Sequence, residues 1–452
     1  MQLFKKLTRK YQRFKLGKTP QQNLFYGFLS YVIIGSILLC LPFFQKTSSS
    51  ILDHLFIATS AVSTTGLVTI SVFDTYNFGG QLIVMLLFQL GGIGYLTFTT
   101  FMLLSTTRKI TRWHKSILNS EFTLPVTIKI KDFLKSVILF TAIMEVLGAI
   151  LFFIAFKVEG MATGNALWNA VFHSVSAFCT AGFSLFNSGF TEYVDNGLVN
   201  FIISFLAIAG SLGFIVVTDF VLWFKNKSHS ISFTTKIVLV GFAILLSFGF
   251  GFFYFYEPTV TSLEGSSRLY AAFFQSMTAM TTVGFNTVDF GTFVMPMLVA
   301  TVFLMYIGAS PSGTAGGMKI TTLTAVLSIM KSRLRGSKRI TFFGKVIPFE
   351  RLYIATSSFI FYTSLIFLGV FILSFSEGFD LEKIIFEVAS ALGTVGLSMG
   401  ITGDLSITGK ITLIFLMFIG RLGVLTFGLA IWSKRVNQES DDLEIPEDDI
   451  AV

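Results

Sequence analysis

The feature that most constrains the fold of this chain is a short segment that occurs four times. Each copy ends in Thr-x-Gly followed by Leu or Phe. Aligned on the glycine without gaps, the copies share phenylalanine ten residues upstream, serine or threonine six upstream and alanine five upstream. The spacing of the glycines, roughly 110 residues, gives each repeat room for more than one helix pair. The four endings are Thr64-Thr65-Gly66, Thr180-Ala181-Gly182, Thr282-Val283-Gly284 and Thr394-Val395-Gly396.

Each segment has helical character for roughly a dozen residues, which is too short to cross a hydrocarbon core ~30 Å thick. A helix that stops inside the membrane directs its last carbonyls and its negative dipole end inward. Such a backbone is tolerated there only where it lines a wet cavity or is buried in protein. Four such ends around one axis predict a ring of carbonyl oxygens that replaces the hydration shell of a cation, which is a selectivity filter. Four aligned copies disfavour the alternative of simple turns between buried helices.

The composition indicates a membrane protein, since 53% of the residues are hydrophobic and only 13% are charged, against about 25% charged in soluble proteins. We therefore predict an all-α polytopic fold of four repeats, each a span, a pore helix and a span, with eight transmembrane helices and four re-entrant pore loops around one pseudo-fourfold pore. Lys and Arg concentrate in segments expected in the cytosol, which explains the net charge of +8 without nucleic acid and places both termini inside. The predicted boundaries are a basic N-terminus (1–20), repeat 1 (21–107), repeat 2 (108–227), repeat 3 (228–335), repeat 4 (336–433) and an acidic cytosolic tail (434–452).

The second span of the third repeat differs from the others. The apolar stretch from Phe293 to Met330 is too long for one span, and glycine and proline in its middle should interrupt any helix. We expect a gating loop inside the membrane here, inward of the filter and present in the third repeat alone. Glycines at 91–94 and 210–213, in the matching spans of repeats 1 and 2, are expected to let helices pack closely. The gate residues are Gly308, Ala309, Ser310, Pro311, Ser312, Gly313, Thr314, Ala315, Gly316 and Gly317.

Two basic residues are predicted at membrane depth. Arg421 lies ten residues into the final span, where a charge costs ~2.5 to 3.5 kcal/mol and so requires a partner or a wet cavity. It is either a barrier to cations below the filter, an anchor for carbonyls of the 308–317 loop, or the ion-pair partner of an acid such as Glu145 or Asp219. Lys319 either contacts the gate or extends toward the cytosol.

Few other residues indicate chemistry. His173, Gln275 and Glu387 share one column, nine residues before the filter glycine, and are expected to form hydrogen bonds within the protein. The two cysteines, Cys40 and Cys179, have no metal-binding or disulfide pattern. The sequence offers no catalytic constellation, so we predict that the chain is not an enzyme. We expect no metal beyond the permeating ion and no cofactor bound by this chain.

The fourth ending, Thr394-Val395-Gly396, matches the opening of the potassium-channel filter TVGYG, but no copy continues into Tyr-Gly. Fewer stacked carbonyl sites should discriminate less strongly between potassium and sodium. We expect potassium to be favoured over sodium. No voltage sensor is expected, because no span carries regularly spaced arginines.

The four repeats, the glycine-ended filters, the break before Gly317-Met318-Lys319 and the motif Gly420-Arg421-Leu422-Gly423 together resemble the Trk/Ktr/HKT superfamily of cation transporters, most closely its KtrB-type membrane subunits. The resemblance covers nearly the whole chain. It implies a potassium uptake subunit in a bacterial cell membrane, a homodimer with one pore per protomer, and regulation by a cytosolic ring of RCK-domain (KtrA-like) subunits that bind ATP or ADP. Sodium dependence is likewise implied. Four filter glycines are similar to potassium-selective members.

One alternative from the transporter class stays open at this point. A secondary cation carrier with broken helices and alternating access would also show an interrupted span. Four filter-like ends favour the pore, because alternating access usually involves two related halves.

Overall fold

Each repeat begins with a long apolar helix. The computed structural model describes residues 18–94, 130–225, 230–337 and 339–432, and the four longest apolar helices in these ranges are the first spans. Asparagine, serine and threonine side chains cap several helix starts; at Thr19, for example, a reciprocal pair of hydrogen bonds with Gln22 starts the first span. These spans are α2 (Pro20–Cys40), α8 (Ile130–Val158), α12 (Phe233–Tyr256) and α17 (Phe349–Ser376).

A shorter helix follows each first span and ends just before a Thr-x-Gly segment, as the sequence predicts. Each of them ends three or four residues before its filter glycine, so the four stop at equivalent points to within one residue. The pore helices are α3 (Ile51–Val62), α9 (Thr163–Phe178), α14 (Gly265–Thr281) and α18 (Leu381–Gly393).

The second spans differ from the expectation, because the break is not confined to the third repeat. In repeats 2 and 4, helix pairs bend by 87° and 98° at breaks of a few residues. The bend residues Gly213 and Gly423 have φ of 87° and 89°, a region that favours glycine. Gly94 has φ of 85° where the helix of repeat 1 ends. The elements are α5 (Phe78–Ile93), α10 (Gly197–Ser211) with α11 (Phe214–Lys225), α15 (Met295–Tyr306) with α16 (Ile320–Leu334), and α19 (Ile407–Leu422) with α20 (Val424–Trp432).

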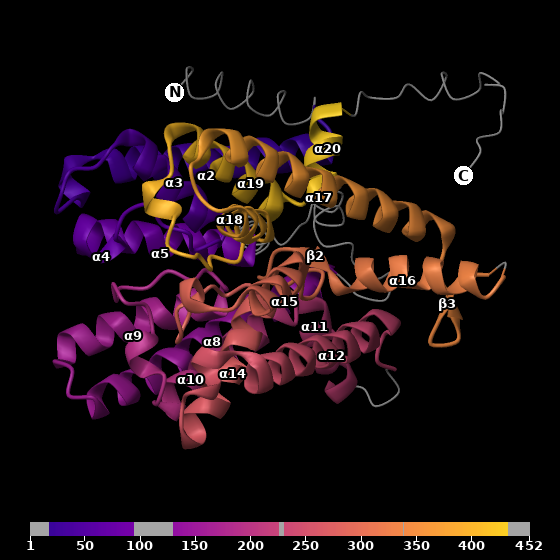
Figure 1. Cartoon of the computed structure of the whole chain (residues 1–452), viewed down its shortest axis with the longest axis horizontal. Coiled ribbons are helices and arrows are strands. Elements are labelled where there is room, and N and C mark those ends of the chain that lie inside the picture. The colour runs from indigo at the N-terminus through magenta and orange to yellow at the C-terminus, as the bar shows by residue number, and fades with distance from the viewer. Residues whose placement is uncertain (1–17, 95–129, 226–229, 338, 433–452) are drawn as a thin grey trace.

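The repeats are arranged as a ring. Repeat 1 contacts repeat 2 through α5 and α9, repeat 2 contacts repeat 3 through α10 and α14, repeat 3 contacts repeat 4 through α15 and α18, and repeat 4 closes on repeat 1 through α19 and α3. Figure 1 shows repeats 1 and 4 on one side of the molecule and repeats 2 and 3 on the other. Large apolar side chains remain exposed on the first spans, for example Ile150, Ile244 and Phe367, as expected of surfaces that face lipid.

Short elements complete the chain. A two-stranded parallel pair, β1 (Ile307–Gly308) and β2 (Met318–Lys319), closes the base of the intramembrane loop. The antiparallel pair β3 (Thr341–Phe342) and β4 (Lys345–Val346) joins α16 to α17. Single turns are η1 (Pro42–Phe44), α4 (Val72–Thr75), η2 (Thr191–Tyr193), α13 (Pro258–Thr261), η3 (Phe290–Thr292) and η4 (Thr402–Asp404). Three predicted segments lie largely outside the described residues. They are the basic N-terminus, the stretch from residue 95 to residue 129 at the junction of repeats 1 and 2, and the acidic tail.

Candidate cation filter and gate

The four Thr-x-Gly segments share an uncommon backbone. Their threonines have φ of 51°, 49°, 56° and 48°, in the left-handed region that β-branched residues rarely occupy. Their glycines also have positive φ, from 68° to 92°, while the residue between does not. Alternation of handedness turns successive N–H groups to one side of the chain and successive carbonyls to the other. Such backbone strain persists only where the surroundings hold it in place, and it is typical of functional sites.

Each pore helix holds its own filter segment in this conformation. The N–H of the middle residue donates to the backbone carbonyl five residues upstream in every repeat, for example Thr65 to Ser60 at 2.8 Å and Val395 to Ser390 at 2.8 Å. The hydroxyl of that same column adds a second bond. Ser60 and Ser390 accept from the N–H of the filter glycine, both at 3.1 Å. The equivalent Ser176 and Thr278 donate to the carbonyl after the glycine, at 2.8 and 2.6 Å.

The four segments close into a ring in chain order. A Cβ atom added to Gly66 would lie 2.6 Å from the carbonyl oxygen of Ala181 in the next repeat, and one on Gly182 would lie 2.6 Å from that of Val283. On Gly284 it would lie 2.2 Å from the oxygen of Val395. The ring closes because a Cβ on Gly396 would lie 2.1 Å from the oxygen of Thr65. Each filter glycine therefore leaves space for the neighbouring repeat's carbonyl.

The predicted gating loop is docked on the break in repeat 2. Ser310 and Thr314 donate their N–H groups to the carbonyls of Ser211 and Gly210, at 3.3 and 3.1 Å. In return, Phe214 donates to the carbonyl of Ser312 at 3.1 Å. A Cβ on Gly210 would lie 2.0 Å from the carbonyl oxygen of Phe178, at the end of the pore helix. The glycines at 210–213 thus allow close packing, as predicted, and also receive the loop.

The loop also touches the inner side of the filter. The N–H of Gly316 donates to the Thr282 hydroxyl at 3.0 Å. A Cβ on Gly316 would lie 1.9 Å from the hydroxyl oxygen of Thr394. The loop that the sequence predicts to be a gate therefore rests against the threonines of repeats 3 and 4, where only glycine fits.

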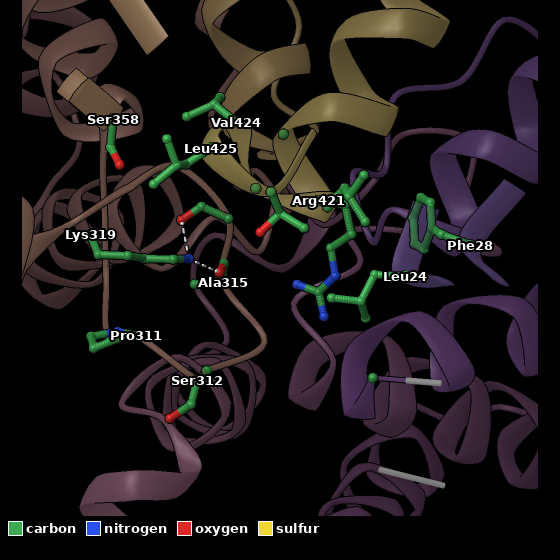
Figure 2. Close-up of a pocket in the computed structure, with 18 of the residues that line it drawn as sticks. Leu24, Phe28, Pro311, Ser312, Ala315, Lys319, Ser358, Arg421, Val424 and Leu425 are labelled. Carbon is green, nitrogen blue, oxygen red and sulfur yellow. Dashed lines mark hydrogen bonds between the residues drawn. The ribbon is translucent and has the colours of Figure 1, made fainter. Parts of the chain in front are cut away.

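Both basic residues at membrane depth bind backbone carbonyls. Lys319 donates from Nζ to the carbonyls of Ala315 at 2.6 Å and Gly316 at 3.0 Å. Arg421 donates to the carbonyls of Thr314, Gly91 and Gly92, with Nη2 3.1 Å from the last. Figure 2 shows the two side chains on opposite sides of a cavity of about 490 Å³. These contacts match the carbonyl-anchor alternative for Arg421 and the gate-contact alternative for Lys319.

The polar column behind the filter makes the expected intramolecular bonds. His173 Nδ1 lies 2.8 Å from the carbonyl of Asn169, so that Nε2 accepts from the N–H of Leu185 at 3.2 Å. Gln275 and Glu387 bind hydroxyl groups of the segments that follow their own filters. The Cys179 thiol is buried and lies 3.4 Å from Gln89 Oε1. Within the described ranges, no group of three His, Cys, Asp or Glu side chains is placed to hold a metal.

Two features escaped the sequence interpretation. The docking of the loop on Gly210 and Ser211 joins residues about 100 positions apart, which no local pattern indicates. The bends at Gly213 and Gly423, and the helix end at Gly94, coincide with a recurring Gly-x-x-Gly at residues 210–213, 420–423 and 91–94, which alignment of the second spans would have found.

Comparison with known proteins agrees with this geometry. Residues 8–442 match the TrkH family of cation transport proteins. The chain is 34% identical to the Ktr system potassium uptake protein B of Bacillus subtilis, over 90% of this chain and 92% of that protein. It is also 34% identical to the potassium/sodium uptake protein NtpJ of Enterococcus hirae, over 98% and 99%. The crystal structure of the potassium transporter TrkH from Vibrio parahaemolyticus has the same fold, with a TM-score of 0.70, 21% identity, and coverage of 90% of this chain and 84% of that one.

A membrane protein of four span–pore–span repeats, with carbonyl-lined segments at its centre, is by class a cation transport protein. The family match over residues 8–442 makes the assignment specific: the chain belongs to the TrkH cation transport family. This membership confirms the predicted family and fold, and it confirms that the chain is a transporter and not an enzyme.

Proposed function

We propose that this chain is the potassium translocation subunit of a bacterial uptake system. The observation that carries the proposal is the closed ring of four filter segments, in which each glycine packs against the carbonyl of the following repeat. Two relatives at 34% identity are named for potassium uptake and for potassium/sodium uptake. Carbonyl oxygens that replace a hydration shell suit a monovalent cation of the size of potassium. The filter is shorter than TVGYG, so sodium is discriminated less strongly. Sodium dependence of uptake is proposed from the family resemblance and not from any residue of this chain.

In this proposal the loop from Gly308 to Gly317 is the gate, and its observed position corresponds to the closed state. Its hydrogen bonds reach the break of repeat 2 and Thr282 of the filter in repeat 3. Arg421 of repeat 4 adds a bond to Thr314 while also binding Gly91 and Gly92 of repeat 1. All four repeats therefore contribute to the closed position. Opening exchanges these bonds for bonds to water in the widened pore.

The remaining parts of the proposal concern assembly. The chain forms a homodimer in the bacterial cell membrane with both termini in the cytosol. A cytosolic ring of RCK-domain subunits binds ATP or ADP and biases the gate. The name of the Bacillus subtilis relative, protein B of a Ktr system, supports the presence of further subunits. The sequence of this chain carries no nucleotide-binding fingerprint, so nucleotide control belongs to the ring.

A carrier with alternating access is the second candidate, because the bends of 87° and 98° break second spans in repeats 2 and 4 as well as in repeat 3. Removing the loop separates the two functions. A gated pore without its gate conducts more, whereas a carrier without part of a broken helix loses transport.

The test is potassium uptake in cells that lack their own potassium uptake systems. Wild type and a deletion of residues 310–315 are compared with and without a candidate ring subunit, at matched abundance in the membrane. We expect wild-type uptake to depend on the ring subunit and the deletion variant to take up potassium without it. Absence of uptake by the deletion variant, with wild type active, supports the carrier. Absence of potassium uptake by the wild type with every ring subunit tested rejects the proposed function.

A further inference from the structure

Helix α11 begins at the bend of repeat 2, and two of its first N–H groups find their acceptors in the 308–317 loop. The first N–H groups of a helix have no partner within the helix itself. In α11, the N–H of Phe214 donates to the carbonyl of Ser312 at 3.1 Å, and the N–H of Ile215 donates to the Ser312 hydroxyl at 3.3 Å. The N–H of Val217 returns to the carbonyl of Gly213 at 3.2 Å, inside the same segment. The helix is therefore capped by a residue that lies 97 positions after Ile215 in the chain.

The backbone of Ser312 is held in an uncommon conformation where it makes this cap. Its φ is 61°, in the left-handed region that residues other than glycine rarely adopt. The loop also approaches the bend closely, since a Cβ added to Gly213 would lie 2.8 Å from the carbonyl oxygen of Pro311. Figure 2 shows the Ser312 hydroxyl directed away from Lys319 and Arg421. The cap on α11 is thus a separate attachment of the loop, and such strain persists only where the surroundings hold it in place.

Helix α11 is itself anchored to the rest of the protein. Asp219 is buried, and its Oδ2 accepts from the N–H of Ser232 at 2.7 Å. Ser232 is the N-cap residue of α12, the first span of repeat 3. Asp219 lies about one helical turn beyond Ile215, so the anchor and the cap belong to successive turns of one helix. Helix α11 also packs against α8, the first span of its own repeat.

We propose that α11 holds the 308–317 loop in its observed position through the Ser312 cap, so that displacement of α11 releases the loop. The inference rests on the proposed function, in which this loop is the gate. Movement of the loop takes both acceptors away from the first turn of α11. Conversely, a weaker anchor at Asp219 lets that turn move away from Ser312. The gate is therefore controlled from a helix outside the loop, and this helix continues to Lys225 on the predicted cytosolic side.

The first experiment tests the cap. It measures potassium uptake without a ring subunit, in cells that lack their own potassium uptake systems and at matched protein abundance. Ser312→Ala removes the acceptor of the Ile215 N–H and should raise this uptake several-fold. Ser312→Asn should keep the wild-type level, because asparagine is a good capping residue and is enriched in the left-handed region. The control is Ser310→Ala, since the Ser310 hydroxyl donates within the loop, to the carbonyl of Pro311 at 2.9 Å. This control should leave uptake unchanged.

The same cap is measured without transport by hydrogen exchange on the purified full-length protein. Amides of residues 214–217 should exchange faster in Ser312→Ala than in wild type, because the first turn of α11 has lost an acceptor. They should exchange at the wild-type rate in Ser310→Ala.

The second experiment tests the coupling through α11. Asp219→Ala removes the acceptor of the Ser232 N–H and should raise uptake without the ring subunit several-fold. Combined with Ser312→Ala, it should raise uptake by less than the product of the two single effects, because both changes act through one contact. Combined with deletion of residues 310–315, it should have no further effect, since the cap is already gone.

The outcomes are distinguishable. Wild-type exchange of residues 214–217 in Ser312→Ala overturns the cap, as does a Ser312→Asn variant that behaves like Ser312→Ala. Wild-type uptake by Asp219→Ala, or an equal increase with and without residues 310–315, overturns the coupling. If Asp219→Ala does not fold, Ser232→Pro decides the coupling by the same criteria, because it removes the donor N–H at a residue whose φ of −64° suits proline. Loss of uptake in the deletion variant argues instead against the proposed gate, and the exchange rates still decide the cap.

Discussion

Gly396→Ala is the substitution whose effect the structure defines most closely. The added methyl group would lie 2.1 Å from the carbonyl oxygen of Thr65, whereas real Cβ contacts are essentially never shorter than 3.0 Å. The carbonyl of repeat 1 must therefore withdraw by about 1 Å, the scale of displacement at which a binding site loses its function. Alanine at φ of 90° also costs ~1 to 2 kcal/mol in the backbone.

Gly400→Ala separates these two effects. Gly400 has φ of 86°, but an added Cβ would meet nothing within 4 Å, so that variant carries the backbone strain without the displaced carbonyl. We expect Gly396→Ala to lower the ratio of potassium to sodium uptake at least tenfold, equivalent to ~1.4 kcal/mol of discrimination. Gly400→Ala should keep the wild-type ratio. The assay is uptake of both ions in deficient cells at matched protein abundance. A Gly396→Ala variant with wild-type selectivity would refute the steric account of the ring.

Two further predictions concern the gate and the outer side of the pore helices. Thr282→Val keeps the shape of the side chain but removes the acceptor of the Gly316 N–H, so the loop should loosen and potassium uptake without the ring subunit should rise several-fold. The control is Thr281→Val, because the Thr281 hydroxyl bonds only within its own helix. This control should leave potassium uptake unchanged. Asp53 forms an ion pair with Lys410 at 2.9 Å that joins repeats 1 and 4. Burial opposes ionisation of Asp53, but hydrogen bonds from Lys410 and Ser50 outweigh it and lower the pKa of the carboxyl. A lowered pKa means that the stabilisation is complete above the unfolded value near pH 4 and is lost as the pH falls through the folded value. Lys410→Met should therefore cost about 1 kcal/mol at pH 7 and progressively less below pH 4, measured by thermal unfolding in detergent; a difference that does not change with pH would contradict this assignment.

The pore helices and filters were predictable because their signals are local and repeated. A single Thr-x-Gly indicates only a turn, but four aligned copies specify a common structure, and each filter is held by residues of its own pore helix such as Ser60 and Ser390. The four-repeat fold followed from that repetition together with the apolar spans. The same reasoning predicted the interruption of the apolar stretch in repeat 3, where α15 ends at Tyr306 and α16 begins at Ile320.

The predictions failed or stayed open where the contacts join distant parts of the chain. The glycines at 210–213 were expected only to let helices pack closely, but Gly213 and the equivalent Gly423 also bend their helices. Glycine in a membrane span does not by itself indicate a bend, since close packing against a neighbouring helix requires the same residue. Only the recurrence of Gly-x-x-Gly at residues 210–213 and 420–423 indicates the bends of 87° and 98°. For Arg421 the sequence left three alternatives open, one of them the carbonyls of the 308–317 loop, to which Thr314 belongs; it did not indicate the contact with Gly91. Among its acceptors are backbone carbonyls of repeats 1 and 3, and carbonyls have no sequence signature.

The closed ring also bears on how such a pore diversifies. Its four quarters are encoded in one gene, so a change of one codon alters one quarter and displaces one neighbouring carbonyl, as between Gly396 and Thr65. In a pore built from four identical subunits, the same codon change would alter every quarter at once. The column Ile57, His173, Gln275 and Glu387 shows that divergence of this kind has taken place behind the filter while the glycines in front stayed the same. Ion preference in a pore of this architecture can therefore change through single substitutions, each of which alters one quarter of the ring.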